Sequence, residues 1–293
     1  MFSAALEKVS RYTHPVVVSC RSFNGNVECS VGTFIILNEE GWILTSAHIL
    51  GVLTAANAHQ KAVSDYENRK TEIEQQANLN SKERKRLLRK LTFNEKWITN
   101  CSYWWATDRA TIRVFVHDNF KDLAAGRLEP FDSKSVTAYP VFMNPKNELL
   151  TGTSLCRLGF PFHKIEASYD GATDRFQLAP GSLPFPRFPI DGIYTRNAVL
   201  RDEKSGKEAK FLETSSPGLR GQSGGPIFDA EGNIWALQSR TKHLPLGFSP
   251  KVKRGDKEVE EHQFINVGLG THVEEIVSFL TQHNIRFKVS PDS

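Results

Sequence analysis

One stretch of the chain reads Gly218-Leu219-Arg220-Gly221-Gln222-Ser223-Gly224-Gly225-Pro226-Ile227-Phe228, which places a serine among glycines ahead of a short apolar run. Glycine accepts backbone conformations with positive φ that strain other residues, so the stretch indicates a tight turn. Such a turn can leave neighbouring N–H groups pointing at one spot beside the serine hydroxyl. A nucleophile next to convergent donors is what acyl transfer requires. The alternative is an ordinary Gly-rich turn with a surface serine, and the rest of the chain has to decide between the two.

Length and composition predict a globular protein without a membrane span. The chain has 293 residues, 39% of them hydrophobic and 10% aromatic, which is enough for one large domain or two smaller ones. No apolar run approaches the ~18 residues that a spanning helix needs. Residues 1–8 lack a basic segment followed by a continuous apolar one, so we expect no signal peptide and a cytoplasmic location. The four cysteines have no zinc-site spacing, and we expect no metal or other cofactor.

The N-terminal part predicts a short helix and then a β-meander. Residues 1–12 are amphipathic, and β-branched runs at 15–20, 29–37 and 42–45 are separated by turn residues. The last run ends at Thr45-Ser46-Ala47-His48, so His48 is expected just past a strand end, where barrel loops carry chemistry.

Asn24-Gly25 is a strong signal for a two-residue hairpin turn. A turn centred there places Cys20 directly opposite Cys29, at a separation that permits a disulfide. In a reducing cytoplasm we expect both to be free thiols.

Residues 51–98 interrupt the β pattern. An apolar seam, then a turn at 78–81, then a basic run at 82–91 predict a helical hairpin inserted in a β domain. The insertion carries ten Lys or Arg and six Asp or Glu, and its net charge of +4 equals that of the whole chain. The remainder of the chain is therefore neutral.

Strand-like runs return after the insertion. They lie at 110–116 and 123–128, and, after a connection at 130–150, near 154–158, 164–168, 192–200, 209–214, 227–228, 233–239 and 264–268. Helical spacing of apolar residues at 272–283 predicts a closing amphipathic helix.

Three segments taken together resemble the trypsin/chymotrypsin-like serine peptidases: Leu44-Thr45-Ser46-Ala47-His48, Asp122-Leu123-Ala124 and Gly221-Gln222-Ser223-Gly224-Gly225-Pro226. The order His, Asp, Ser is that of the family. The chain resembles bacterial members in particular, including the high-temperature-requirement proteases. The resemblance covers both halves of the chain but not residues 51–107.

The resemblance implies a catalytic triad and a fold. Ser223 is the nucleophile, His48 the base and Asp122 the residue that orients it, with the backbone N–H groups of Gly221 and Ser223 as oxyanion hole. Asp118 is the rival aspartate, and Ser239 aligns with a hydroxyl that supports Asp122. The implied fold is all-β: two antiparallel six-stranded β-barrels, at 1–140 (with the insertion at 51–98) and 141–293, plus a C-terminal helix.

The resemblance also places a substrate pocket. Pro217 and Gly218 align with its base, Gly268 and Gly270 with its wall, and Arg220 and Arg240 with its rim. No carboxylate stands at the base and the small glycines leave room, so we expect poor cleavage after Lys or Arg and better cleavage after apolar or acidic residues.

Two other functions stay open. Gly221 to Gly225 also fits the G-x-S-x-G elbow of esterase-type α/β-hydrolases, although that fold needs a helix after the serine and the acid and histidine later in the chain. A trypsin-like scaffold without activity that binds a protein partner is the other. The main hypothesis is a serine endopeptidase that acts on proteins or peptides. We expect an acidic protein partner at the basic hairpin 51–98, no membrane, and no nucleic acid, because aromatics are not interleaved with its charges.

Overall fold

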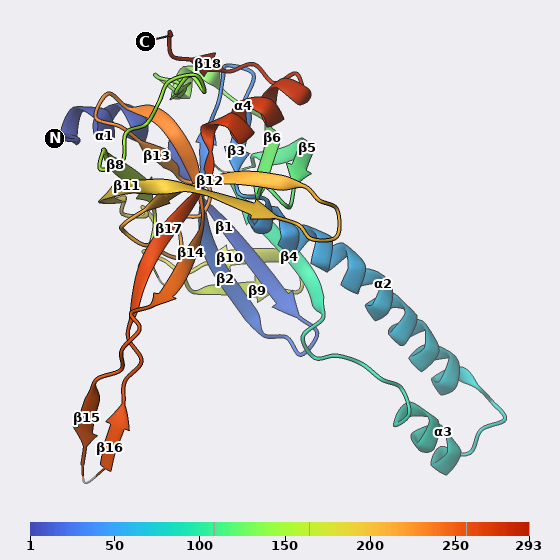
Figure 1. The fold of residues 1–293 in the computed structure, drawn as a ribbon. Coiled ribbons are helices and arrows are strands. Elements are labelled where there is room, and N and C mark those ends of the chain that lie inside the picture. The colour runs from blue at the N-terminus through green and yellow to red at the C-terminus, as the bar shows by residue number, and fades with distance from the viewer. Residues whose placement is uncertain (108, 164, 256, 293) are drawn as a thin grey trace.

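The structure is a computed structural model that describes residues 1–107, 109–163, 165–255 and 257–292. Two large β-sheets make up most of it, and two slender arms project from the body (Figure 1). One arm is helical and the other is a two-stranded ribbon. Among the described residues, no helix combines the length and the apolar character needed to cross a membrane.

The first sheet is formed by the N-terminal half. Its hydrogen-bonded order is β4-β1-β2-β3-β6-β5, with every pair antiparallel. The strands are β1 (Thr13–Ser22), β2 (Val27–Ile36), β3 (Trp42–Thr45), β4 (Ile98–Trp104), β5 (Thr111–Asp118) and β6 (Leu123–Glu129). β-Branched and aliphatic residues fill these strands, and the large apolar side chains buried in β3 and β6 each add roughly 1.5–3 kcal/mol. The sequence pattern located five of these strands but missed β4.

The second sheet has eight strands in the order β13-β8-β11-β12-β17-β14-β7-β18. β13 also pairs with β14, so six of the strands form a closed ring of hydrogen-bonded neighbours. The strands are β7 (Val141–Phe142), β8 (Ser154–Gly159), β11 (Phe188–Arg201), β12 (Glu208–Thr214), β13 (Pro226–Phe228), β14 (Asn233–Pro245), β17 (Phe264–His272) and β18 (Lys288–Val289). Two small hairpins accompany it: β9 (Ala167–Asp170) with β10 (Arg175–Leu178), and β15 (Lys251–Arg254) with β16 (Lys257–Glu260).

The expected architecture is confirmed as a mostly β protein with a helical insertion and a closing helix. The two sheets are not simply two six-stranded barrels, because the first has unpaired edges at β4 and β5 and the second gains β7 and β18. The helices are α1 (Ser3–Ser10), α2 (Ala47–Gln75), α3 (Ser81–Leu88) and α4 (Val273–Gln282), with a short 3₁₀ helix η1 (Ser133–Ser135). Buried residues of α1 and α4 join the same hydrophobic core as the first sheet.

The helical arm is longer than expected, because α2 begins at Ala47 and includes His48. The turn before α3 is as predicted: the Asn80 side chain accepts from the N–H of Glu83, and Glu83 accepts from the N–H of Asn80. An aromatic cluster of Phe23, Tyr66 and Phe93 holds the arm against the β1–β2 turn, with ring centroids 5.5–5.6 Å apart. The arm is thus fixed to the first sheet rather than loosely tethered.

The expected Cys20–Cys29 pairing is wrong by one residue. Cys20 faces Glu28, and Ser19 faces Cys29. The turn has three residues, because the N–H of Gly25 bonds to the carbonyl of Ser22 and Gly25 takes φ +87°. That is a type I turn followed by a left-handed residue, the common three-residue alternative to the predicted two-residue turn.

Cys20 faces Cys101 of β4 instead, and its thiol donates to the Cys101 sulfur at 3.7 Å. This hydrogen bond lowers the pKa of Cys101 and raises that of Cys20. A mild thiol oxidant such as diamide should therefore join Cys20 to Cys101, which peptide mapping by mass spectrometry would detect. Cys29→Ser should leave this link unchanged and Cys101→Ser should abolish it. A dominant Cys20–Cys29 link would contradict the observed register.

Candidate functional site

Asp122 holds His48 through its backbone and its ring. Asp122 lies in the turn between β5 and β6 with φ 56°, and His48 lies in the first turn of α2, directly after β3. The Asp122 carboxylate accepts from the backbone N–H of His48 at 3.0 Å, and its two oxygens lie 3.0 and 2.9 Å from Nδ1 of the ring. The Asp122 side chain is 7% exposed, whereas the His48 side chain is 51% exposed. With Nδ1 held by the carboxylate, Nε2 is the ring nitrogen left to accept a proton.

Ser239 completes the environment of Asp122 from the second sheet. Its hydroxyl, on β14, donates to Oδ2 of Asp122 at 2.5 Å and is 5% exposed. The Arg240 guanidinium donates to the Ser239 hydroxyl at 3.3 Å and lies over the Phe211 ring. The Ser239 hydroxyl therefore contacts Asp122, and Arg240 contacts this network from an exposed position.

Asp118, the alternative candidate for the triad aspartate, makes a different set of hydrogen bonds. Its Oδ1 accepts from the N–H groups of Phe120 and Lys121 at 2.9 and 3.1 Å, which stabilises the turn that carries Asp122. The hydrogen bonds of the described residues include none between Asp118 and His48. The Thr271 hydroxyl, from the second sheet, also holds this turn by donating to the Lys121 carbonyl at 2.7 Å.

The Ser223 turn is fastened to the first sheet by Thr33. The N–H of Thr33 donates to the Ser223 carbonyl at 2.8 Å, and its hydroxyl donates to the Gly221 carbonyl at 2.7 Å. The Ser46 hydroxyl, next to His48, donates to the carbonyl of Gln238 at 2.9 Å. These bonds bring the Ser223 turn and the His48–Asp122 pair together from opposite sheets. Nothing in the sequence motif pointed to Thr33, because a single threonine inside a strand carries no distinctive pattern.

The glycines of the turn are required by close packing. Gly221 and Gly224 have φ +96° and +81°. A Cβ at Gly224 would collide with the carbonyl oxygen of Thr33, and one at Gly225 with that of Leu158. Gln222 is fully buried, and its amide accepts from the Leu219 N–H at 3.0 Å and donates to the Phe188 carbonyl at 3.3 Å. The turn is therefore rigid and braced from within.

Two N–H groups of this turn are left open. The N–H groups of Gln222, Gly224 and Gly225 donate to backbone carbonyls at 2.8–3.0 Å. Within the described chain, those of Gly221 and Ser223 have no such acceptor. The same hydrogen bonds include none between the Ser223 hydroxyl and His48. Ser223 itself is partly exposed.

A family model described as "Trypsin-like peptidase domain" matches residues 32–237, which contain His48, Asp122 and Ser223. The chain belongs to this family. It is a trypsin-like serine protease, a hydrolase of peptide bonds. The α/β-hydrolase alternative does not fit, since the antiparallel strand β13 rather than a helix follows Ser223.

Two solved structures are similar to this protease. One is Rv3671c from M. tuberculosis, solved as a serine-to-alanine mutant in an inactive form, with 12% identity, a TM-score of 0.46, and 95% of this chain and 89% of that one covered. The other is the HtrA-type protease AlgW, solved as a serine-to-alanine mutant with a tripeptide, with 14% identity, a TM-score of 0.47, and 97% and 65% coverage. A comparison with curated proteins gave no match.

The expected pocket residues of the protease come together only in part. The Thr241 hydroxyl donates to the Gly218 carbonyl at 2.6 Å, and the N–H of Gly268 donates to the Ser216 carbonyl at 2.9 Å. The segment expected at the base of the pocket therefore lies beside the strand expected to form its wall. The room expected beside the glycines is filled, because a Cβ at Gly218 would collide with Gln238 and one at Gly268 with Arg157.

The expected wall residue Gly270 packs against the hydrophobic core. A Cβ at Gly270 would meet Ile227 and Ala236, which belong to the hydrophobic core. Arg220 is exposed. The sequence reasoning missed Arg157 and Gln238, since both lie in strands where a polar residue is normally expected to face solvent.

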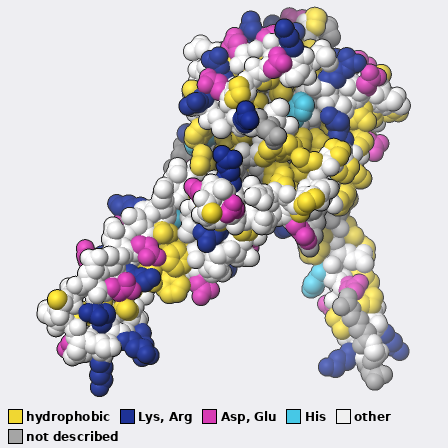
Figure 2. Space-filling view, turned by 180° about the vertical axis from the view of Figure 1, so that it is seen from behind, with side chains coloured by type: hydrophobic (Ala, Val, Ile, Leu, Met, Phe, Trp, Pro, Cys, Tyr) yellow, Lys and Arg dark blue, Asp and Glu magenta, His cyan; other side chains and the backbone are white. Residues whose placement is uncertain are grey.

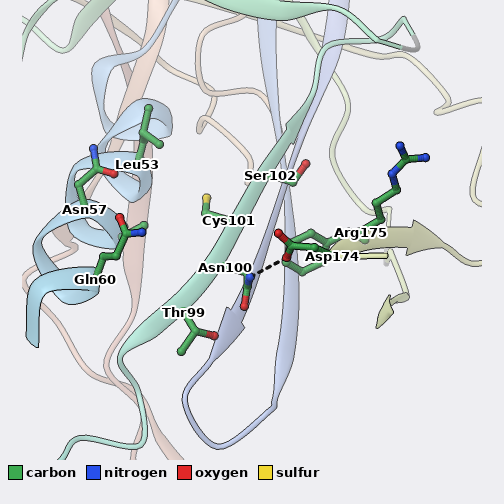
Figure 3. Close-up of a pocket in the computed structure, with 11 residues that line it drawn as sticks. Leu53, Asn57, Gln60, Thr99, Asn100, Cys101, Ser102, Asp174 and Arg175 are labelled. Carbon is green, nitrogen blue, oxygen red and sulfur yellow. Dashed lines mark hydrogen bonds between the residues drawn. The ribbon is translucent and has the colours of Figure 1, made fainter. Parts of the chain in front are cut away.

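A separate polar cavity of about 430 Å³ lies between α2, β4 and the β9–β10 hairpin (Figure 3). Asn57 and Gln60 reach it from α2, and Asn100 donates to Asp174 across its floor at 3.0 Å. None of the residues that line it is a predicted site residue. Within the described chain, no three His, Cys, Asp or Glu side chains are grouped so that they could hold a metal.

Proposed function

We propose that this protein is a serine endopeptidase that uses His48, Asp122 and Ser223 as a triad and forms an acyl-enzyme. The clamp of Asp122 on both the backbone and Nδ1 of His48 is the observation that carries the proposal. It fixes the tautomer in which Nε2 can accept the proton of Ser223, and it stabilises the imidazolium that results. Ser239 supports the clamp by holding Oδ2.

In the first step Ser223 Oγ attacks the substrate carbonyl while its proton passes to Nε2 of His48. The open N–H groups of Gly221 and Ser223 bind the oxyanion, and such donors contribute about 3–4 kcal/mol each. The imidazolium then gives its proton to the leaving amine, and water attacks the ester in the same way. The missing Ser223–His48 hydrogen bond is compatible with this course, because such bonds often form only once substrate is bound.

The two sheets supply the two halves of this site, and we propose that they correspond to the barrels of the family, with units at 1–140 and 141–293. The closed ring of six strands in the second sheet supports this for the C-terminal half. The bonds from Thr33 and Ser46 to the Ser223 turn support a site between the halves.

A fluorophosphonate probe tests the function directly, because it reacts with an activated serine and needs no knowledge of the substrate. We expect wild-type protein to be labelled at Ser223, as located by mass spectrometry, and to lose the label after His48→Ala. Absence of labelling would favour the alternative of an inactive scaffold that binds a protein partner.

We further propose that the helical arm binds an acidic protein, either a substrate or a regulator. Basic side chains gather toward the end of this arm (Figure 2). Five of them are exposed on and after α3: Lys82, Lys85, Arg86, Arg89 and Lys90. Among the described residues none of these five lies within 4.0 Å of a carboxylate, so their charge is available to attract a partner. Arg84 is different, because it donates to the Gln76 carbonyl at 3.0 Å and so helps to hold the turn.

Replacing those five residues with Gln, and leaving Arg84 in place, should separate binding from chemistry. Cleavage of a short peptide should stay at the wild-type rate, while pulldown or cleavage of an acidic protein should weaken several-fold and lose its dependence on salt. A control variant, Lys204→Gln with Lys207→Gln in the exposed β11–β12 turn, should change neither. Unchanged binding by the five-residue variant across ionic strengths would show that the arm has no such role.

A further inference from the structure

Arg157 is a buried cation in the second sheet. It lies on β8 with 2% exposure, and its guanidinium donates through Nη1 to the Pro217 carbonyl at 2.7 Å and through Nη2 to the Thr214 hydroxyl at 2.6 Å. Its Nε has no partner within the described chain. Burial lowers the pKa of Arg157 to about 10, so the group stays charged at neutral pH.

No carboxylate balances this charge. The described residues place no carboxylate oxygen within 4.0 Å of its nitrogens. Glu213, one residue from Thr214, is already paired with Arg196 at 3.0 Å. A buried charge without a counter-ion is costly, and a protein that keeps one gains when a ligand brings the opposite charge.

The guanidinium lies at the wall of the proposed pocket. Its Nη2 occupies the space that a side chain at Gly268 would take, close to the half-buried residues Ser216 and Pro217. Gln238 fills the corresponding space at Gly218, and its Oε1 has no partner in the described chain. Of these two side chains, only Arg157 has an unpartnered N–H donor suited to a carboxylate, because the unpartnered atom of Gln238 is an acceptor and its amide nitrogen donates to the Arg240 carbonyl.

We propose that Arg157 determines specificity, by selecting substrates with Asp or Glu on the acyl side of the cleaved bond. The substrate carboxylate supplies the missing counter-charge, and the Pro217 and Thr214 bonds hold the guanidinium in place to meet it. This inference rests on the proposed function, since it assigns the pocket to the serine site. A purely structural Arg157 would brace the 214–217 segment without any preference for charge.

The test compares two peptides that differ only by Glu or Gln at the cleaved position, with wild-type protein. Because hydrogen bonds to charged groups are strong, we expect kcat/KM to favour the Glu peptide by about 10- to 100-fold. The preference should persist at high salt, since a buried pair is poorly screened, and it should survive Arg220→Gln. Equal rates for the two peptides would overturn the inference.

Two variants then test whether Arg157 is the source of the preference for the Glu peptide. Arg157→Met keeps the length of the side chain without its charge, and should bring the Glu/Gln ratio to near one while the Gln peptide is still cleaved. Arg157→Lys should preserve the sign of the preference. If the Arg157→Met protein does not fold, the Glu/Gln ratio measured with wild-type protein and with the Arg157→Lys variant still tests the inference. Fluorophosphonate labelling of Ser223 with no Glu preference overturns only the role of Arg157, whereas no labelling and no cleavage overturn the proposed function as well.

Discussion

Replacing Ser223 with alanine should reduce kcat by about 10⁶-fold, the loss seen when a triad serine is removed from a well-studied serine protease. Without the hydroxyl there is no nucleophile, and His48 and Asp122 have nothing to activate. The fold should persist, because the bond that anchors the residue runs from the Thr33 N–H to the Ser223 carbonyl, which alanine retains.

The measurement is single-turnover hydrolysis of a peptide ester or anilide, with circular dichroism and thermal unfolding to confirm the fold. Ser168→Ala, at an exposed position of β9, serves as a matched control and should behave as wild type. Near-normal hydrolysis by the Ser223→Ala protein would disprove the triad assignment.

Asp122→Asn should lower kcat by about 10⁴-fold near neutral pH, as the same change does in the best-studied member of the family. An amide at this position favours the wrong His48 tautomer and cannot stabilise the imidazolium. Asn is the appropriate substitute, because Asp122 has φ 56° and Asn tolerates this left-handed conformation about as well. The effect therefore reports chemistry and not a distorted turn.

Asp118→Asn is the matched control, four residues away in the same turn. An asparagine Oδ1 can still accept from Phe120 and Lys121, so activity should stay within a few-fold of wild type. Comparing the two variants by kcat and by urea unfolding assigns the aspartate. The reverse outcome, with Asp118→Asn inactive and Asp122→Asn active, would contradict the geometry.

The sequence alone predicted the structure correctly where short-range residue patterns determine it. The Gly-rich turn, the β-meander before His48, the turn before α3 and the closing helix α4 all follow from short-range signals that tertiary contacts did not override. The family order of His, Asp and Ser then pointed to His48 and Asp122, which the fold joins by hydrogen bonds.

Other features depended on contacts that short-range patterns do not encode. The register of β1 and β2 differs from the predicted one because Gly25 allows a three-residue turn, which places Glu28 rather than Cys29 opposite Cys20. Cys101 lies on the other side of Cys20, in β4. Strand β4 was missed because it follows a long helical insertion and is only partly buried. Arg157 was missed because β8 is buried on both faces over most of its length, so the usual inference that a charged residue points to solvent fails there.

The fastening of the Ser223 turn by Thr33 has a consequence for synthesis of the chain. The N-terminal half can fold and bring His48 to Asp122 as it leaves the ribosome, because domains tend to fold as units from the N-terminus. Ser223 and Ser239 lie later in the chain, and the Ser223 turn gains its bonds to Thr33 only when the second sheet packs on the first. A chain that stops before residue 223 lacks the serine of the proposed triad, however completely its first sheet has folded.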